Sequence, residues 1–144
     1  MSREELFGLL PHRGHMLLLD GARREGEEAV AWYTVRGDEF FLNGHFPGNP
    51  VVPGVILCEM MAQSACVLLE GLMQGKLPLY TGMDRVRFRS PVRPGDILTM
   101  RCRITRQKHP FYFCSGRVLA GERLCAEAQF SFAIAEAEAC SQKS

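Results

Sequence analysis

Residues 44–54 read GHFPGNPVVPG, and residues 55–74 read VILCEMMAQSACVLLEGLMQ. Three prolines and three glycines in the first stretch are incompatible with a continuous helix or strand, so it predicts a rigid loop. That loop would hold His45 in a fixed place. Pro53 and Gly54 are typical of a helix start. The sequence therefore predicts a long helix over residues 55–74, about 30 Å in length.

This predicted helix is apolar on almost every side, which is typical of a helix that lies inside a protein. Its polar exceptions Glu59, Gln63 and Glu70 fall close to one face. A carboxyl group in such a position is rare unless it is paired or used in chemistry. The same polar residues argue against a transmembrane helix, which needs about 20 predominantly apolar residues.

Length and composition favour one domain without a cofactor or metal. The 144 residues suggest a single domain over residues 1–135 and a frayed tail over 136–144, and a chain of this size often completes its site with a second subunit. A net charge of +1 is too small to attract nucleic acid or an anionic membrane through the overall electrostatic field of the protein. The six cysteines lack metal-ligand spacing and read as core thiols. Together with the absence of a signal-peptide pattern, they predict a cytoplasmic protein.

The first half of the chain predicts one short helix and two strands. Ser2 and Glu5 match a capping box, so a helix should begin there and end before Pro11. We expect an apolar strand over residues 16–20 and a polar break over residues 23–28. A strand rich in aromatic and branched residues should follow over residues 29–35.

After the long helix the pattern changes to alternation of apolar and polar residues, which indicates strands. The expected elements are a linker, a strand, a turn, a second strand and a hairpin of two more strands: residues 75–78, 85–89, 91–96, 98–105, 111–119 and 124–134. The chain thus predicts an α+β fold in which one antiparallel sheet curls around one central helix.

Four sequence blocks resemble the (3R)-hydroxyacyl-[acyl-carrier-protein] dehydratases of type II fatty acid synthesis, the FabZ family. They are LPHR at 10–13, GHFPGNPVVPGV at 44–55, EMMAQ at 59–63 and RFRSPVRPGD at 87–96. The likeness runs from about Leu9 to Ile134. It implies a hotdog fold, a homodimer whose two sheets join, and commonly a trimer of dimers. Gly14 and His15 depart from the aromatic residue and proline that the family usually has there.

The resemblance also assigns residues. His45 and Glu59 match the family's catalytic pair, contributed by different subunits, and Gly54 matches the position whose backbone N–H polarises the thioester carbonyl. A related isomerising enzyme carries Asp where this chain has Glu59, so the resemblance favours dehydration alone. Chemically, neutral His45 suits a base and protonated Glu59 an acid or a water-orienting group. Gln63 would either orient Glu59 or form a helix-packing hydrogen bond.

Residues 85–108 carry eight basic side chains and one acidic one, a local charge of +7. Such a face can dock an acidic acyl carrier protein, or it can be an ordinary solvated strand face. It lacks interleaved exposed aromatics, which disfavours nucleic acid. The docking candidates are Arg85, Arg87, Arg89, Arg93, Arg101 and Arg103.

Three other functions remain open from the sequence. A hotdog thioesterase would hydrolyse the thioester rather than dehydrate it. A non-catalytic acyl-binding subunit would keep the fold without turnover. A dehydratase of a specialised polyketide or polyene pathway would use identical chemistry on a different acyl chain.

Overall fold

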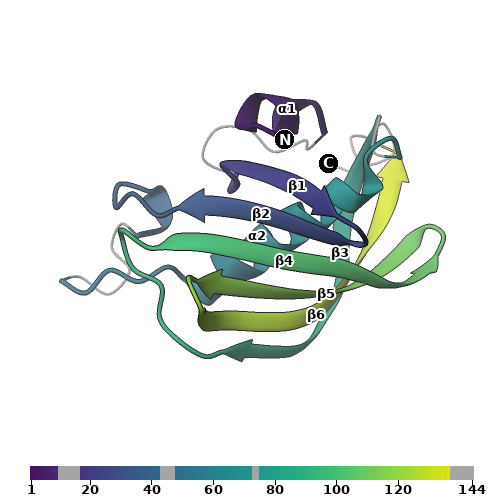
Figure 1. Ribbon diagram of the computed structural model, residues 1–144. Coiled ribbons are helices and arrows are strands. Elements are labelled where there is room, and N and C mark those ends of the chain that lie inside the picture. Colours follow the sequence, from purple (N-terminus) through teal and green to yellow (C-terminus); the bar gives the residue numbers. More distant parts are fainter. Residues whose placement is uncertain (10–16, 43–47, 73–74, 137–144) are drawn as a thin grey trace.

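The computed structural model describes residues 1–9, 17–42, 48–72 and 75–136. Its elements follow in the order α1 (Arg3–Leu9), β1 (Gly21–Glu25), β2 (Glu28–Thr34), η2 (Phe40–Leu42), α2 (Gly54–Cys66), η3 (Val67–Leu69), β3 (Lys76–Phe88), β4 (Ile97–Lys108), β5 (Phe111–Ala120) and β6 (Arg123–Glu136). The six strands form one antiparallel sheet in the order β1-β2-β4-β5-β6-β3. Figure 1 shows this curved sheet with α2 behind it, which confirms the predicted α+β class.

The helix α2 lies against the inner face of the sheet, where most of its side chains are buried. Close approach to the central strands depends on Gly116 of β5. A Cβ atom there would stand 2.9 Å from Cys102 Sγ and 3.1 Å from Met61 Sδ. Cys102 Sγ also donates a hydrogen bond to the Met61 carbonyl oxygen at 3.3 Å. The missing side chain of Gly116 thus lets helix and sheet pack closely.

The predicted helix over residues 55–74 is wrong in length. The α-helix ends at Cys66, a 3-10 turn covers Val67–Leu69, and Glu70 has left the helical region at φ −54° and ψ 132°. Gly71 follows with φ +92°. Leu69 is buried, so the chain must turn where this side chain enters the core. Apolar composition continues past that point and gave no sign of the turn.

The predicted strand over residues 16–20 is also wrong. Leu17, Leu18 and Leu19 are buried at three successive positions and belong to no strand, whereas a strand would point alternate side chains to opposite faces. The first strand is instead β1, which begins at Gly21 and runs into the stretch interpreted as a polar break. Its charged residues are exposed at the edge of the sheet, and Gly26 at φ +61° makes the turn into β2.

The long strand β3 contains all but the last residue of the short strand predicted over residues 85–89, and much of the predicted linker. It pairs with β6 rather than with β4, so the segment over residues 91–96 joins two strands that are not neighbours. Two irregularities interrupt the pairing, and Arg85 in the second has φ +52°. The strand over residues 85–89 was predicted from alternating apolar and basic residues, and these bulges break that alternation.

Several predictions are confirmed. The strands β4, β5 and β6 cover the predicted ranges, with β5 and β6 forming the hairpin. The capping box exists, because the Glu5 N–H donates to Ser2 Oγ and the Ser2 N–H donates to Glu5 Oε1.

The five described cysteines are buried free thiols: Cys58, Cys66, Cys102, Cys114 and Cys125. Cys140 and the tail over residues 137–144 lie outside the described residues. In the described ranges, no helix combines the length and hydropathy needed to cross a membrane.

Candidate active site

Glu59 lies in the middle of α2 and is held by Gln63, one helical turn further on. Gln63 Nε2 donates a hydrogen bond to Glu59 Oε1 at 3.2 Å. The Gln63 side chain is fully buried, and its Oε1 accepts a hydrogen bond from the Leu18 backbone N–H at 2.9 Å. Leu18 therefore fixes the amide of Gln63, and this amide fixes one oxygen of the half-buried Glu59 carboxyl group.

A hollow of about 40 Å³ opens beside this carboxyl group. We call it the Glu59 hollow, and its lining comes from one face of α2 and from strands β3 and β6: Glu59, Ala62, Gln63, Cys66, Pro78, Tyr80 and Phe132. Its lining is mostly apolar. Of the residues that the structure describes, only Glu59, Gln63 and Tyr80 bring strongly polar groups to the lining, an arrangement typical of a site that orients an apolar ligand.

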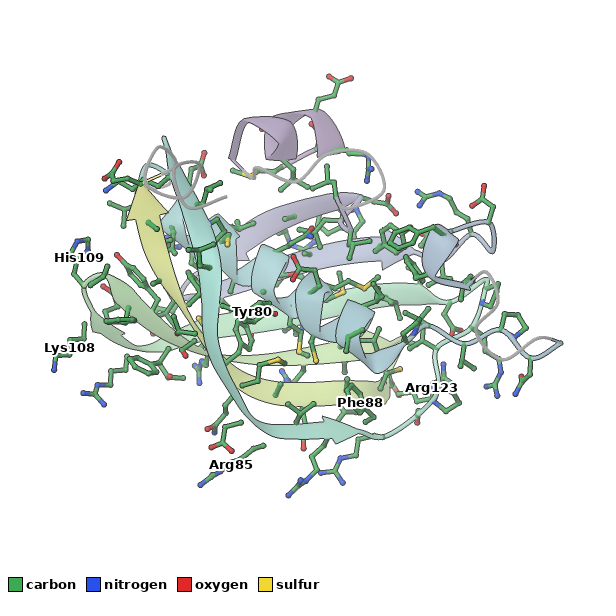
Figure 2. The ribbon with its side chains drawn as sticks, turned by 180° about the vertical axis from the view of Figure 1, so that it is seen from behind. Tyr80, Arg85, Phe88, Lys108, His109 and Arg123 are labelled. Carbon is green, nitrogen blue, oxygen red and sulfur yellow. The ribbon has the colours of Figure 1, made fainter. Side chains whose placement is uncertain are left out.

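Tyr80 joins β3 to the helix at this hollow. Its hydroxyl donates a hydrogen bond to the Cys58 carbonyl oxygen at 2.6 Å, and its ring meets Phe130 edge to face. Burial and the neighbouring Glu59 raise the pKa of the Tyr80 hydroxyl. The hydroxyl is thus protonated and donating near neutral pH. Figure 2 shows Tyr80 lying next to α2.

The start of α2 forms a second hollow, about 280 Å³ in volume, which we call the Gly54 hollow. Pro53 occupies the N-cap, and no side chain of the described part of the chain caps the helix. Within the described residues, no hydrogen bond uses the backbone N–H of Gly54 or Val55. The first N–H groups of a helix lack internal partners and carry the positive end of its dipole. This end of α2 can therefore stabilise a developing oxyanion.

Phe88, at the end of β3, covers Gly54 from one side. A Cβ atom on Gly54 would stand 2.5 Å from Phe88 Cζ, so the ring rests directly on the glycine backbone. Phe88 is also 56% exposed, and Figure 2 shows it at the end of α2. The family resemblance predicted Gly54 as a site residue, but the alternation around Arg87 and Arg89 did not single out Phe88.

Among the described residues, none lines both the Gly54 hollow and the Glu59 hollow. In one copy of the chain, the exposed helix start and the carboxyl group therefore face different spaces. His45 lies in residues 43–47, outside the described residues, so the predicted His45–Glu59 pair stays a prediction. The Gly14-His15 departure is also outside them.

The thiols beside Glu59 are not activated nucleophiles. Burial and the neighbouring Glu59 raise the pKa of the Cys58 thiol, and burial raises that of Cys66. A thiol with a raised pKa stays protonated near neutral pH and attacks poorly. The polar groups next to this hollow are thus suited to moving or holding a proton rather than to forming a bond through sulfur.

The six arginines predicted for docking lie in different places. Arg89 lines the Gly54 hollow, and the Arg93 backbone N–H donates to Asp96 in the nearby loop. Arg87 is exposed on β3. The other three line a hollow on the outer face of the sheet, away from α2: Arg85, Arg101 and Arg103.

Comparison with known proteins gives a consistent result. Residues 22–143 match the family model described as ApeI-like, ApeI dehydratase. The chain is 44% identical over 140 residues to a protein of Moorella thermoacetica named 3-hydroxyacyl-[acyl-carrier-protein] dehydratase FabZ, covering 94% of this chain and 98% of that one. A protein of Caulobacter with the same name is 38% identical, covering 92% and 85%.

Solved structures agree on the fold. The dehydratase heterocomplex ApeI:P from Xenorhabdus doucetiae superposes with a TM-score of 0.80 at 21% identity, covering 95% of each chain. A fluoroacetyl-CoA-specific thioesterase superposes with a TM-score of 0.71 at 15% identity, covering 85% of this chain and 96% of that one. Both likenesses are to the fold, whereas the family rests on the sequence matches. The chain therefore belongs to the family of ApeI-like and FabZ hotdog dehydratases.

Proposed function

We propose that this protein is a hydro-lyase that converts a (3R)-3-hydroxyacyl thioester of acyl carrier protein to the trans-2-enoyl thioester in fatty acid synthesis. The observation that carries the proposal is the half-buried Glu59 carboxyl group, held by Gln63 at the mouth of an apolar hollow. The relatives named FabZ at 38–44% identity support the same reaction.

Dehydration needs a base, an acid and a hydrogen-bond donor that stabilises the thioester carbonyl oxygen. His45 removes the proton from the carbon next to the thioester carbonyl, and negative charge develops on the carbonyl oxygen. The backbone N–H of Gly54 stabilises that oxygen; a comparable donor elsewhere contributes about 10²–10³ in rate. Glu59 protonates or orients the departing hydroxyl group, which leaves as water. No cofactor is required by this scheme.

We further propose that the working site combines two copies of the chain. Among the described strands, β3 is at the edge of the sheet and pairs only with β6, and its exposed large side chains include Leu79, Tyr80, Met83 and Phe88. Such an edge is a template for pairing with another strand. Antiparallel pairing of two β3 strands near Asp84 would place Phe88 of one copy close to Tyr80 of the other. The Gly54 hollow of one copy would then meet the Glu59 hollow of the other.

A homodimer of this kind also accounts for the separation of the two hollows within one copy. A trimer of dimers, which the family resemblance implies, would add further contacts without changing this site. Light scattering at several concentrations gives the oligomer size. The FabZ pair His45 and Glu59 would then come from different subunits.

For the carrier protein, we propose docking at the start of α2 through Arg89 and Arg93. Arg89 lines the Gly54 hollow, where the thioester must arrive, and its side chain is 53% exposed. A basic rim at this entrance would steer an acidic carrier protein. We also propose the cytoplasm as the compartment, since the five buried cysteines are free thiols, which a reducing environment preserves.

The test is the hydration of a 2-enoyl thioester, which is measured as the loss of its enoyl absorbance. A thiol-release assay is run in parallel. Wild-type protein should hydrate the double bond and release no thiol. His45→Ala should abolish hydration while circular dichroism stays unchanged. Thiol release without hydration would identify a thioesterase, and wild-type turnover in the His45→Ala variant would refute the assigned base. Inactivity of pure protein on a series of chain lengths would favour an acyl-binding subunit.

A further inference from the structure

The outer face of the sheet carries a hollow that the proposed reaction does not use. Its volume is about 520 Å³, within the range of small-molecule sites. Arg101 and Arg103 of β4 point to this face, because the alternate residues Met100 and Cys102 are buried on the side of α2. The sheet therefore separates this outer-face hollow from Glu59.

The walls of the outer-face hollow bring arginines from three strands together. Arg101 of β4 and Arg117 of β5 are direct cross-strand partners, and like charges in such pairs destabilise a sheet. Arg103 lies two residues along β4 on the same face, and Arg85 of β3 also lines the hollow. Four guanidinium groups are thus gathered at one place, at a cost in electrostatic repulsion.

The two carboxylates that line the hollow are already engaged in ion pairs. Glu28 accepts from Arg101 at 2.6 Å, and Glu127 accepts from Arg89 at 2.8 Å. Across the described part of the chain, Arg85, Arg103 and Arg117 form no ion pair. With four arginines and two glutamates, the described lining keeps a charge of +2, and Glu25, which lies outside it, approaches only Arg101 of these four arginines, at 3.9 Å.

Arg85 is also held in an unusual backbone conformation. It has φ +52°, in the bulge of β3 between Asp84 and Arg87, and it is the only non-glycine residue with positive φ among those described. Asp84 Oδ1 stabilises this turn by accepting the Arg85 backbone N–H at 2.9 Å. Left-handed backbone at a residue with a side chain costs energy and tends to occur where a side chain must be aimed. Figure 2 shows Arg85 away from α2.

From these observations we infer that the outer-face hollow binds a phosphorylated small molecule as a dianion. A phosphomonoester carries a charge of about −1.5 to −2 near neutral pH, which matches the lining. Guanidinium groups bind phosphate oxygens bidentately, and Ser115 and Gln129 add neutral donors to the lining. Because side chains form walls around the hollow, it can enclose a small molecule, whereas a flat surface would be expected for docking another protein.

The binding test uses full-length protein with inorganic phosphate and inorganic pyrophosphate as probes. Calorimetric titration at constant ionic strength, with sodium chloride as the balancing salt, separates specific binding from screening. Wild-type protein should bind both probes saturably, inorganic phosphate as the dianion that matches the charge of the lining and pyrophosphate as a more highly charged probe. Arg103→Gln and Arg117→Gln should each weaken binding about tenfold or more, because a hydrogen bond to a charged group is lost. The affinity of Arg103→Lys should lie between that of the two glutamine variants and that of the wild type.

Arg106→Gln is the matched control. Arg106 is an exposed arginine of the same strand β4, but it stacks over the Phe113 ring outside the hollow, so its loss should leave binding unchanged. Without phosphate, Arg117→Gln should melt at the wild-type temperature or above, because a like-charge contact is removed. Melting well below wild type would contradict the repulsion argument.

Two results would overturn the inference. One is equal heat for pyrophosphate and chloride, or equal binding by wild type and both glutamine variants. The other is a raised KM for carrier-bound substrate in Arg103→Gln with an unchanged KM for a short pantetheine thioester, which would make this face a carrier-docking surface. The binding readout does not depend on turnover, so failure of the proposed dehydration would leave it interpretable.

Discussion

The two hollows beside α2 are built in opposite ways. The Gly54 hollow depends on an absent side chain, since the Phe88 ring rests where a Cβ would stand. The Glu59 hollow depends on hydrogen bonds that are present, from the Leu18 backbone N–H to the Gln63 side chain and from Gln63 to Glu59. The first is therefore sensitive to added atoms and the second to removed hydrogen bonds. Substitutions chosen on this basis test whether both belong to one catalytic site.

The largest effect is expected from removing the acid function of Glu59. Glu59→Gln keeps the size of the side chain and the possibility of a hydrogen bond to Gln63, but it removes the ionisable proton. The rate kcat for hydration should fall by about 10²–10⁴, the usual contribution of a general acid or base. The melting temperature should stay close to wild type. Full activity in this variant would remove the Glu59 hollow from the reaction.

The next largest effect is expected at the helix start. Gly54→Ala retains the backbone N–H but places a Cβ 2.5 Å from Phe88 Cζ, so the ring or the helix must move. We expect kcat/KM to fall by about 10²-fold, as for a displaced oxyanion donor. The double variant Gly54→Ala with Phe88→Ala should recover at least part of this loss. An additive double-mutant cycle would show that the contact does not control the donor.

A smaller effect is expected at Gln63, because it acts through Glu59. Gln63→Met keeps the volume but leaves the buried Leu18 N–H without its acceptor, which should lower the free energy of unfolding by about 1–3 kcal/mol. kcat should fall while KM changes little, and the pH profile of kcat should shift. An unshifted profile at reduced stability would make Gln63 a packing residue only. Ser64→Ala, which also removes a buried hydrogen-bonding side chain of α2, is the control.

The smallest effect is expected at Tyr80. Tyr80→Phe loses one hydrogen bond to the Cys58 carbonyl oxygen, worth about 0.5–1.5 kcal/mol, and should change kcat little. Because the pKa of Tyr80 is raised in the folded protein, stability is lost as pH rises above the unfolded tyrosine value of about 10. Urea unfolding between pH 8 and 11 should show a shallower alkaline loss in Tyr80→Phe than in wild type. Parallel curves would contradict the raised pKa of the Tyr80 hydroxyl.

The sequence predicted what depends on local chemistry. Pro53-Gly54 marked the start of α2, the spacing of four residues put Glu59 and Gln63 together, and regular alternation gave β4, β5 and β6. The end of α2 was missed because it depends on where Leu69 enters the core and on the positive φ of Gly71, neither of which the apolar composition encodes.

The residues that complete the two hollows were missed for a different reason. Tyr80 reaches a carbonyl 22 positions earlier, and Phe88 covers a glycine far back in the chain. Both lie on β3, where bulges break the alternating pattern that would have revealed the strand. An exposed aromatic residue in an edge strand has no local signature, so only the assembled fold shows its contact.

The buried thiols have a practical consequence for following how this molecule opens. Burial raises the pKa of Cys66 and Cys102, and raises that of Cys114 to about 12, so a maleimide or disulfide reagent can label them only after local or global opening. In a variant without Cys140, labelling rates at these sites would time the separation of helix from sheet. The native cysteines can therefore serve as probes of the opening rate, and mass spectrometry can measure their labelling without an attached dye.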